Sequence, residues 1–335
     1  MSTEVERAGA PAATGVRDVV GSLEAARPWT ARPVPGEIPY GDMPGDQVRI
    51  GATQVAKAAT LLPPLAEHLL PVLARSACSR AVVAVAGGSG VGKSEIASLL
   101  AFQLRSMGIG TYTLSGDNYP HRIPRLNDAE RLRVFRRGGL RGLLASGLHT
   151  PQRSRALLAL QAAGVDADRA RAAGCEWLAV YQDAGRASLA GYLGTRHESD
   201  FDELSAIVRR FTDGADALYL RRMGREEAEV WYDLVDVSDV RVLVIEWTHG
   251  LSDALLGVDV PILLDSTPAE TLEHRRARNR DGGVDSPFTA LVLEIEQELL
   301  DSRAHTARIV LSKGGELRSP DVRRHAGRAG EVPGA

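Results

Sequence analysis

Five short apolar runs are spaced along the chain, and each has the length of a β-strand. They are residues 81–86 (AVVAVA), 111–114 (TYTL), 242–246 (VLVIE), 261–264 (PILL) and 308–311 (RIVL). A short run of this kind, bounded by polar or glycine residues, is typical of a strand that is buried on both faces of a parallel sheet. The pattern therefore predicts the strands of one buried sheet.

Helical patterns separate these strands. The sequence predicts helices over residues 95–107 and 268–278 and through LVLEIEQELL at 291–300, and a mostly helical stretch between residues 126 and 232. Strands that alternate with helices indicate an α/β fold. We therefore expect a doubly wound parallel sheet of about five strands, interrupted by a helical insertion over about residues 138–200.

The two ends of the chain differ from this pattern. Residues 1–48 are rich in Pro, Gly, Ala and charge, so we expect a flexible N-terminal arm. Residues 49–78 suit helices, which we expect Pro63, Pro64 and Pro71 to interrupt. The main domain is then residues 79–318, and residues 319–335 are expected to be a disordered tail.

Composition narrows the class of protein. The chain has 335 residues, of which 44% are hydrophobic, which suits one sizeable core. Its formal net charge of −3 argues against a general nucleic-acid binder, because such proteins carry a basic excess. The two cysteines, Cys78 and Cys175, lack metal-binding spacing and suit a reducing compartment. Without a signal-peptide pattern or an apolar run of ~18 residues, we expect a soluble cytoplasmic protein with neither nucleic-acid nor membrane partners.

The strongest chemical signal is GGSGVGKS, which directly follows the first expected strand and precedes a helix. It satisfies the G-x-x-x-x-G-K-[ST] pattern, in which backbone N–H groups cradle a phosphate chain, the Lys reaches the terminal phosphates and the hydroxyl binds Mg²⁺. We therefore expect a P-loop NTPase fold that binds ATP and Mg²⁺, although these residues do not distinguish ATP from GTP. The expected nucleotide-binding residues are Gly87, Gly88, Ser89, Gly90, Val91, Gly92, Lys93, Ser94 and Glu95.

Two carboxylates are expected beside this loop. Glu246 ends the run VLVIE, where an ionised group is costly unless Mg²⁺ and Lys93 balance its charge. Asp117 follows the second strand in the turn SGDN, where it can accept a substrate hydroxyl proton or help to hold the metal. Ser94, Glu246 and Asp117 are thus the candidate metal-associated residues. Two plainer alternatives stay open, namely that Glu246 exits the sheet into solvent and that Asp117 is an ordinary turn residue.

Arginines form two groups. The segment HRRARNRDGG places Arg275, Arg276, Arg278 and Arg280 at a helix end. Arginines on a lid can meet the charge that develops in phosphoryl transfer while excluding water, but the helix dipole alone also favours basic residues there. A second group either binds an anionic acceptor or forms a solvated helix face. It comprises Arg122, Arg125, Arg131, Arg133, Arg136 and Arg137.

With these motifs in place, the chain resembles the uridine kinase and phosphoribulokinase family of P-loop small-molecule kinases, over about residues 80–125 and 200–315. GGSGVGKS is similar to that family's phosphate loop, whose lysine is Lys93 here. SGDNYPHR resembles its acid followed by an aromatic residue, which implies Asp117 as catalytic acid/base and Tyr119 near the substrate.

Two further segments carry the resemblance. VLVIEWTHG is similar to the family's strand ending in Glu-Gly, which implies Glu246 as a metal-associated carboxylate. DVPILLDSTPAETLEHRRARNRD resembles its strand, turn and lid helix, which implies Arg276 and Arg280 as catalytic lid arginines. The segments around the two acids also supply candidates for substrate contact beside Tyr119, which are His121, Arg122 and His249.

The chain also departs from this family. Trp247 stands where Gly is expected after the strand Glu, and LYLRRMGREEAEVWYD replaces the P-x-Y-D stretch of the nucleoside kinases. The helical insertion has no counterpart, and is either a cap over the substrate or the face of a homodimer. The identity of the acceptor therefore stays open among nucleosides, sugars and specialised metabolites.

These features lead to one expected function and two alternatives. We expect an ATP-dependent small-molecule kinase, a phosphotransferase that passes the γ-phosphoryl group to a hydroxyl of a metabolite. The alternatives are a switch NTPase and a nucleotide-binding interaction module. No N-K-x-D motif for guanine is present, and the D-x-x-G matches at 18–21 and 42–45 precede the phosphate loop.

Overall fold

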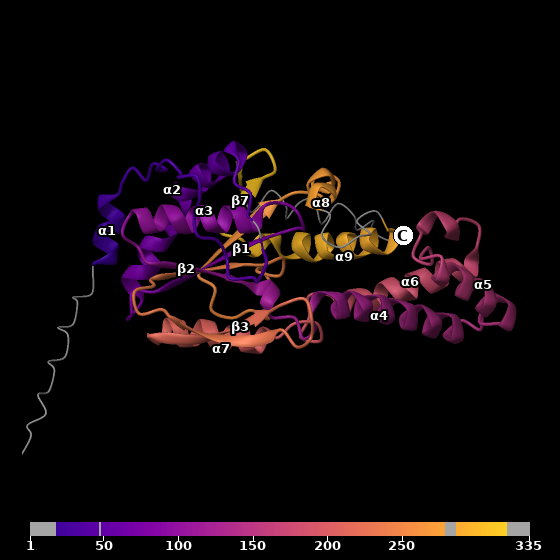
Figure 1. Cartoon of the computed structure of the whole chain (residues 1–335). Helices are drawn as coiled ribbons and strands as arrows, with labels where there is room; N and C mark the ends of the chain where they lie inside the picture. The colour runs from indigo at the N-terminus through magenta and orange to yellow at the C-terminus, as the bar shows by residue number, and fades with distance from the viewer. Residues whose placement is uncertain (1–17, 47, 279–285, 320–335) are drawn as a thin grey trace, which may run out of the picture.

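The computed structural model describes residues 18–46, 48–278 and 286–319, and every structural statement below refers to these ranges. A central six-stranded sheet has the order β2-β5-β1-β6-β7-β8. Its neighbours pair in parallel except at the antiparallel edge strand β8. The strands are β1 (Ala81–Gly87), β2 (Thr111–Ser115), β5 (Val242–Glu246), β6 (Val260–Asp265), β7 (Ile309–Ser312) and β8 (Leu317–Arg318). The predicted α/β fold with a parallel sheet is confirmed (Figure 1).

The strand order places three strand ends side by side. Val85 of β1 pairs with Glu246 of β5, and Glu246 pairs in turn with Ser115 of β2. The chain leaves β1 toward β2 on one side of the sheet and later places β6 on the other, so β1 lies at the topological switch point. In open α/β sheets this is where ligands bind, beyond the carboxyl ends of the strands.

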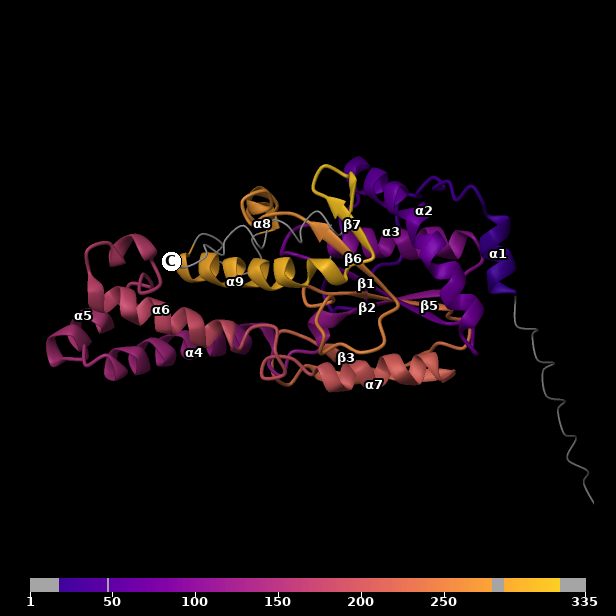
Figure 2. The same cartoon turned by 180° about the vertical axis from the view of Figure 1, so that it is seen from behind.

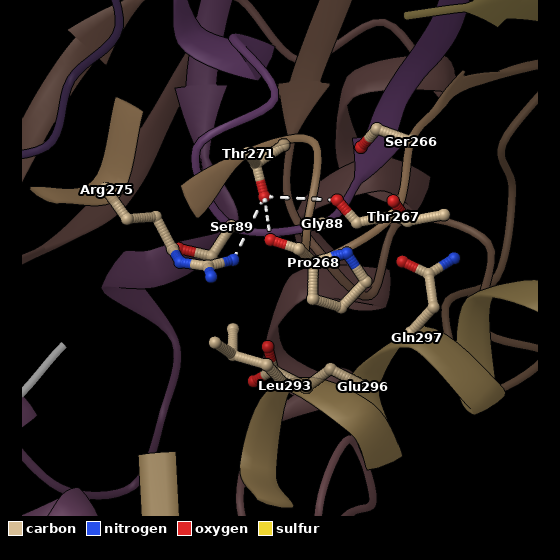
Figure 3. A pocket seen from close by; sticks show the side chains of 10 residues that line it. All are labelled: Gly88, Ser89, Ser266, Thr267, Pro268, Thr271, Arg275, Leu293, Glu296 and Gln297. Atoms are coloured by element: carbon tan, nitrogen blue, oxygen red, sulfur yellow. Dashed lines mark hydrogen bonds between the residues drawn. The ribbon is translucent and has the colours of Figure 1, made fainter. Parts of the chain in front are cut away.

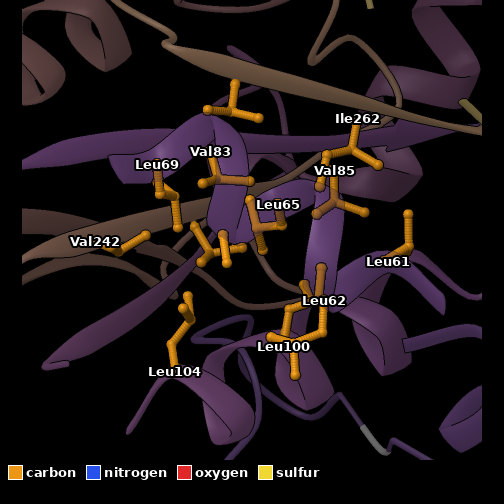
Figure 4. Packing of buried hydrophobic residues seen from close by; sticks show 14 of the residues in the cluster. Leu61, Leu62, Leu65, Leu69, Val83, Val85, Leu100, Leu104, Val242 and Ile262 are labelled. Carbon is orange, nitrogen blue, oxygen red and sulfur yellow. The ribbon is translucent and has the colours of Figure 1, made fainter. Parts of the chain in front are cut away.

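Helices α2 (Ala52–Arg75) and α3 (Lys93–Ser106) cover one face of the sheet. Alternate residues of β1, Val83 and Val85, point into this layer and pack with leucines of α2 and α3 (Figure 4). Each of these side chains is fully buried. Burial of this apolar face is the main source of stability for the layer, because hydrophobic transfer contributes roughly 25 cal/mol per Å².

Helix α2 is continuous, so the interruptions expected at Pro63, Pro64 and Pro71 are wrong. Pro63 and Pro64 are partly exposed and Pro71 is exposed. They therefore lie toward solvent, where water can satisfy the carbonyls that lose an N–H partner. An interior proline costs about 3 kcal/mol, and the buried leucine face of the helix outweighs that cost.

The opposite face of the sheet is covered by α7 (Phe201–Thr212) and by a hairpin of β3 (Ala217–Met223) and β4 (Val230–Asp236) (Figures 1 and 2). The expectation of a mostly helical segment up to residue 232 is therefore wrong for this hairpin. Most of β4 is exposed and carries Trp, Tyr and Leu outward, so its pattern does not show the alternation that marks a half-buried strand.

The helical insertion projects away from the sheet (Figures 1 and 2). It consists of α4 (Pro124–Ala145), α5 (Pro151–Ala162), the turn η2 (Arg169–Ala172) and α6 (Glu176–Ala190). Helix α4 begins at Pro124, earlier than the expected boundary near residue 138. Helix α9 (Pro287–Arg303) links the two parts, because its Leu291 and Ile295 pack against the insertion while Leu300 packs against the sheet layer.

The N-terminal segment differs from the expected flexible arm where it is described. Helix α1 (Val19–Ala25) buries Leu23, and the Trp29 indole is 6% exposed and donates Nε1–H to the Leu23 carbonyl over 2.8 Å. Residues 1–17 and 320–335 lie outside the described ranges, and the expected tail falls almost wholly there. None of the helices within the described ranges has the length and apolar content needed to cross a membrane.

Candidate active site

The phosphate loop joins β1 directly to α3, which begins at Lys93. Gly90 has φ +76°, a backbone conformation that favours glycine, and a Cβ there would lie 2.9 Å from Cγ of Arg275. Lys93 Nζ donates to the Gly88 carbonyl over 3.2 Å, so the ammonium folds back over the loop. Val91 and Glu95 are buried, which fixes the base of the loop against the sheet. The backbone is thus curled at the amino end of a helix, the arrangement that binds phosphate.

Glu246 meets this loop through the first turn of α3. Ser94 Oγ donates to Glu246 Oε2 over 3.1 Å, and Ser115 Oγ donates to Oε1 over 2.6 Å. The carboxyl group is 4% exposed, so it does not exit into solvent. Burial raises the pKa of Glu246 to about 8, and the nearby Asp117 adds to this while Lys93 opposes it. A buried acid at a strand end beside a phosphate loop is a functional-site signal.

Asp117 lies in the short turn η1 (Gly116–Asn118) that follows β2. Asp117 is exposed at the surface of this turn. Desolvation by the surrounding protein raises its pKa, Lys93 opposes that shift and Asp46 adds to it. Because Asp117 raises the pKa of Glu246 and Lys93 opposes the shifts of both acids, the three groups share one electrostatic site.

The oxygen atoms of this site fit Mg²⁺. Ser94 Oγ and the Glu246 carboxylate are within hydrogen-bond distance of each other, and Asp117 is electrostatically coupled to them. Mg²⁺ prefers oxygen ligands and is commonly held by one or two carboxylates together with substrate phosphates. Over the described residues, no group of three or more His, Cys, Asp or Glu forms an all-protein metal cage, and a Mg²⁺ that binds with a nucleotide does not require one.

Helix α8 (Leu272–Arg278) lies over the phosphate loop. Arg275 Nη1 donates to Thr271 Oγ1 over 2.9 Å (Figure 3). A cavity lies between the loop residues Gly88 and Ser89, the segment after β6, α8 and α9 (Figure 3). Arg276 is exposed on α8, and Arg280 lies outside the described residues. The structure thus brings Arg275 to the loop.

The predicted substrate-contact residues do not converge. Tyr119 is fully buried among apolar side chains between α7 and the sheet, so its ring does not face a ligand. His121 is exposed, and its Nε2 lies 2.9 Å from the Arg196 carbonyl. Arg122 Nη1 donates to the Tyr192 hydroxyl over 3.2 Å. His121 and Arg122 therefore lie where the Asp117 segment meets the insertion.

His249 is buried beside Trp247, with ring centroids 5.2 Å apart in an edge-on arrangement. Burial lowers the pKa of His249 to about 4, although Glu198, whose carboxylate is 3.9 Å from Nε2, opposes this. The imidazole is consequently neutral at pH 7. Packing explains its position without a substrate contact.

Trp247 replaces a small residue, and the structure shows what accommodates it. A Cβ at Gly116 would lie 2.1 Å from Trp247 Cγ, so the indole occupies the space above the glycine that precedes Asp117. The Phe201 ring packs on the other side, with centroids 4.8 Å apart. The aromatic residue therefore supports the Asp117 turn.

Several residues around the site escaped the sequence analysis. Glu198 is 1% exposed and accepts hydrogen bonds from Arg131 Nε over 2.6 Å, Asn127 Nδ2 over 3.1 Å and the Gly194 N–H over 2.6 Å. Burial raises the pKa of Glu198, but Arg131 and the other partners outweigh it and leave that pKa below its ordinary value. Arg131 and Glu198 both act electrostatically on Asp117.

Other arginines of the second predicted group also form ion pairs within the insertion. Arg133 pairs with Glu130 and Arg136 with Asp166. The Arg133–Glu130 pair is local, three residues apart on α4, whereas the Arg136–Asp166 pair depends on which elements meet. The group therefore contributes more to holding the insertion together than to an open anion site.

Comparisons with known proteins agree with the phosphate-loop site. A family model for adenylylsulphate kinase matches residues 79–137, which carry β1, the loop and the Asp117 turn. The bifunctional alpha-galactosidase/sucrose kinase AgaSK of Mediterraneibacter gnavus is 38% identical over 239 residues, which is 71% of this chain. The match covers 21% of AgaSK, so the chain spans about a fifth of the length of this relative.

Two solved structures are also similar. One, assigned as a fructose transport system kinase from Silicibacter sp. TM1040, is 18% identical with a TM-score of 0.41, covering 72% of this chain and 88% of that one. The other, assigned as a uridine kinase from Bacillus stearothermophilus, is 16% identical with a TM-score of 0.41, covering 75% of this chain and 98% of that one. The resemblance to P-loop small-molecule kinases rests on the family model and the AgaSK match, which confirm it.

Proposed function

We propose that this chain is an ATP-dependent kinase that transfers the γ-phosphoryl group to a hydroxyl of a small molecule, and that the acceptor is a sugar. The observation that carries the kinase proposal is the convergence of Ser94, Glu246 and Asp117 at the phosphate loop, with Ser94 bonded to Glu246 over 3.1 Å. Similarity to AgaSK, a protein named as a sucrose kinase, supports a sugar over a nucleoside.

The residues of the site have separate roles in the proposed phosphoryl transfer. The acceptor oxygen forms a bond to the γ-phosphorus while the bond from that phosphorus to the β–γ bridging oxygen breaks, and ADP leaves. Asp117 orients the acceptor hydroxyl and takes its proton. The loop N–H groups and Lys93 hold the phosphates in line, which supplies most of the catalysis by positioning. Ser94 and Glu246 would hold Mg²⁺, which would supply positive charge to neutralise the phosphates.

Helix α8 contributes to the same site. Arg275 lies against Gly90, and we assign it, with Arg276, to the developing charge on the transferred group. Closure of this helix would exclude water, which suppresses hydrolysis of ATP.

A product assay tests the proposal. The purified chain is incubated with Mg·ATP and, separately, with sucrose, fructose, glucose or a nucleoside panel, and mass spectrometry detects the gain of one phosphoryl group. We expect a phosphorylated sugar that is lost in Lys93→Ala and retained in Lys313→Ala, a lysine on the loop after β7.

Each other outcome contradicts a defined part of the proposal. A phosphorylated nucleoside and no phosphorylated sugar would show that the acceptor class is wrong. ATP hydrolysis without any phosphorylated acceptor would indicate a switch NTPase, and binding of ATP without turnover would indicate an interaction module.

A further inference from the structure

Asp42 is a buried carboxylate from the segment that precedes the main domain. Its side chain is 7% exposed and accepts four hydrogen bonds. Oδ1 accepts from the Ser115 N–H over 2.7 Å and from Asn118 Nδ2 over 3.1 Å. Oδ2 accepts from the Tyr112 hydroxyl over 3.0 Å and from Arg222 Nη1 over 2.8 Å. The carboxylate is therefore saturated with donors.

The two bonds to Oδ1 span the Asp117 turn. Ser115 is the last residue of β2 and Asn118 directly follows Asp117, so one oxygen atom joins both ends of the turn. Ser115 also donates its hydroxyl to Glu246 over 2.6 Å. Asp42 is thus linked to Glu246 through Ser115, and to Asp117 through the two ends of its turn.

The two bonds to Oδ2 anchor Asp42 to the rest of the fold. Arg222 of β3 also donates to the Tyr112 hydroxyl over 2.9 Å and to Asp233 over 3.0 Å. Asn118 Oδ1 in turn accepts the Met223 N–H over 3.0 Å. A buried ion pair is tolerated only when its remaining groups are satisfied, and the network meets that condition for Asp42. It holds the turn in one arrangement relative to β3.

The other side of the turn is blocked by an indole. Trp247 fills the space above Gly116, where a Cβ would meet its Cγ at 2.1 Å. The turn is therefore fixed between a hydrogen-bonding carboxylate and an aromatic ring. Such support is what a catalytic group needs, because a misplacement of about 1 Å costs on the order of 10²-fold in rate.

We propose that Asp42 is a positioning residue that sets the geometry of Asp117 and Glu246, so that the segment before the main domain is part of the catalytic apparatus. This inference rests on the proposed kinase function. Asp42 acts through Ser115 and Asn118. Its loss should therefore slow the chemical step and weaken Mg²⁺ binding at Glu246, and should leave nucleotide binding by the phosphate loop unchanged.

The test is Asp42→Asn in the full chain, with Asp233→Asn as the matched control, because Asp233 also binds Arg222 but is half exposed. We expect kcat to fall by roughly 10²-fold in Asp42→Asn, with KM for ATP and acceptor within about threefold. We also expect the Mg²⁺ concentration that half-maximally supports ATP binding, measured by calorimetry, to rise roughly three- to tenfold. ADP binding in EDTA stays unchanged, and Asp233→Asn changes none of these values beyond about twofold.

Tyr112→Phe removes one donor to the same carboxylate while conserving shape, so it serves if Asp42→Asn fails to fold. It should lower kcat severalfold at constant KM. Unchanged kcat with a lowered melting temperature, or a parallel loss of ADP binding, would overturn the inference in favour of a merely structural role. If the wild type transfers no phosphoryl group, the proposed function fails, and the Mg²⁺ requirement for ATP binding still decides the role of Asp42.

Discussion

The Ser94 hydroxyl and the Glu246 carboxylate are joined by a hydrogen bond of 3.1 Å, which links the first turn of α3 to the end of β5. These residues are 152 positions apart in the chain. The bond shows why a strand ends in a buried acid here, since it meets a hydroxyl, the Ser115 donor and the Lys93 charge rather than an apolar neighbour. The pair forms the oxygen-rich part of the candidate active site.

Replacement of Asp117 by Asn should remove most turnover while leaving nucleotide binding nearly intact. The amide keeps the shape of the side chain but cannot take the acceptor proton, and general-base help is worth ~10²- to 10⁴-fold. Steady-state phosphoryl transfer and calorimetric ATP binding measure the two effects. Asp239→Asn, on an exposed turn, is the control, and full turnover in Asp117→Asn would contradict the assigned role.

Gly90→Ala should raise the KM for ATP, because it displaces helix α8. The new Cβ would lie 2.9 Å from Arg275 Cγ, so α8 must shift, and we expect KM for ATP to rise roughly tenfold or more. Gly108→Ala is the matched control, because Gly108 has a similar φ of +83° but open space around its Cβ position. Equal effects in the two variants would assign the loss to backbone strain instead.

Gly139→Ala should destabilise the helical insertion. Its Cβ would lie 2.4 Å from the Tyr181 ring, across the interface of α4 and α6. Overpacking of this kind costs about 1–3 kcal/mol, which thermal or denaturant unfolding would detect. At Gly191 the nearest atoms are 3.6 Å away, so Gly191→Ala should change stability little. A Gly139→Ala variant as stable as the wild type would show that α4 and α6 can move apart without loss of stability.

His249 should make the protein sensitive to acid. Burial lowers its pKa from 6.5 in the unfolded chain to about 4 in the folded protein, so the unfolded state binds a proton first as the pH falls. The stability present above pH 6.5 is consequently lost between pH 6.5 and 4, by up to about 3 kcal/mol. Burial is the main cause of this shift; Glu198 opposes it, and Arg131, Arg303 and Lys93 add to it.

The measurement for His249 is urea unfolding at several pH values. The stability difference between wild type and His249→Gln should shrink, or reverse, as the pH falls from 7 toward 4.5, because the variant has no imidazole to protonate. His121→Gln, at an exposed position, serves as the control and should keep the wild-type pH dependence. A pH-independent difference for His249→Gln would mean that folding does not change the pKa of the imidazole.

The sequence was sufficient for features that depend on neighbouring residues. The five apolar runs became strands because a continuous apolar segment has to be buried on both faces, and the phosphate loop requires only glycines, Lys93 and Ser94 in succession. Glu246 and Asp117 were predictable for a related reason, since parallel strands bring their carboxyl ends to one edge of the sheet. Their electrostatic coupling agrees with that prediction.

Tertiary structure decided the features that depend on contacts between distant segments. Asp42 lies in a Pro- and Gly-rich stretch with no local signal, yet it holds Ser115, 73 residues further on. Tyr119 follows Asp117 in the chain but turns into the core, because apolar burial of its ring outweighs exposure at the site. The sequence alone thus determined where the phosphate loop and the two acids come together, whereas packing and buried hydrogen bonds between remote segments determined what holds those acids in place.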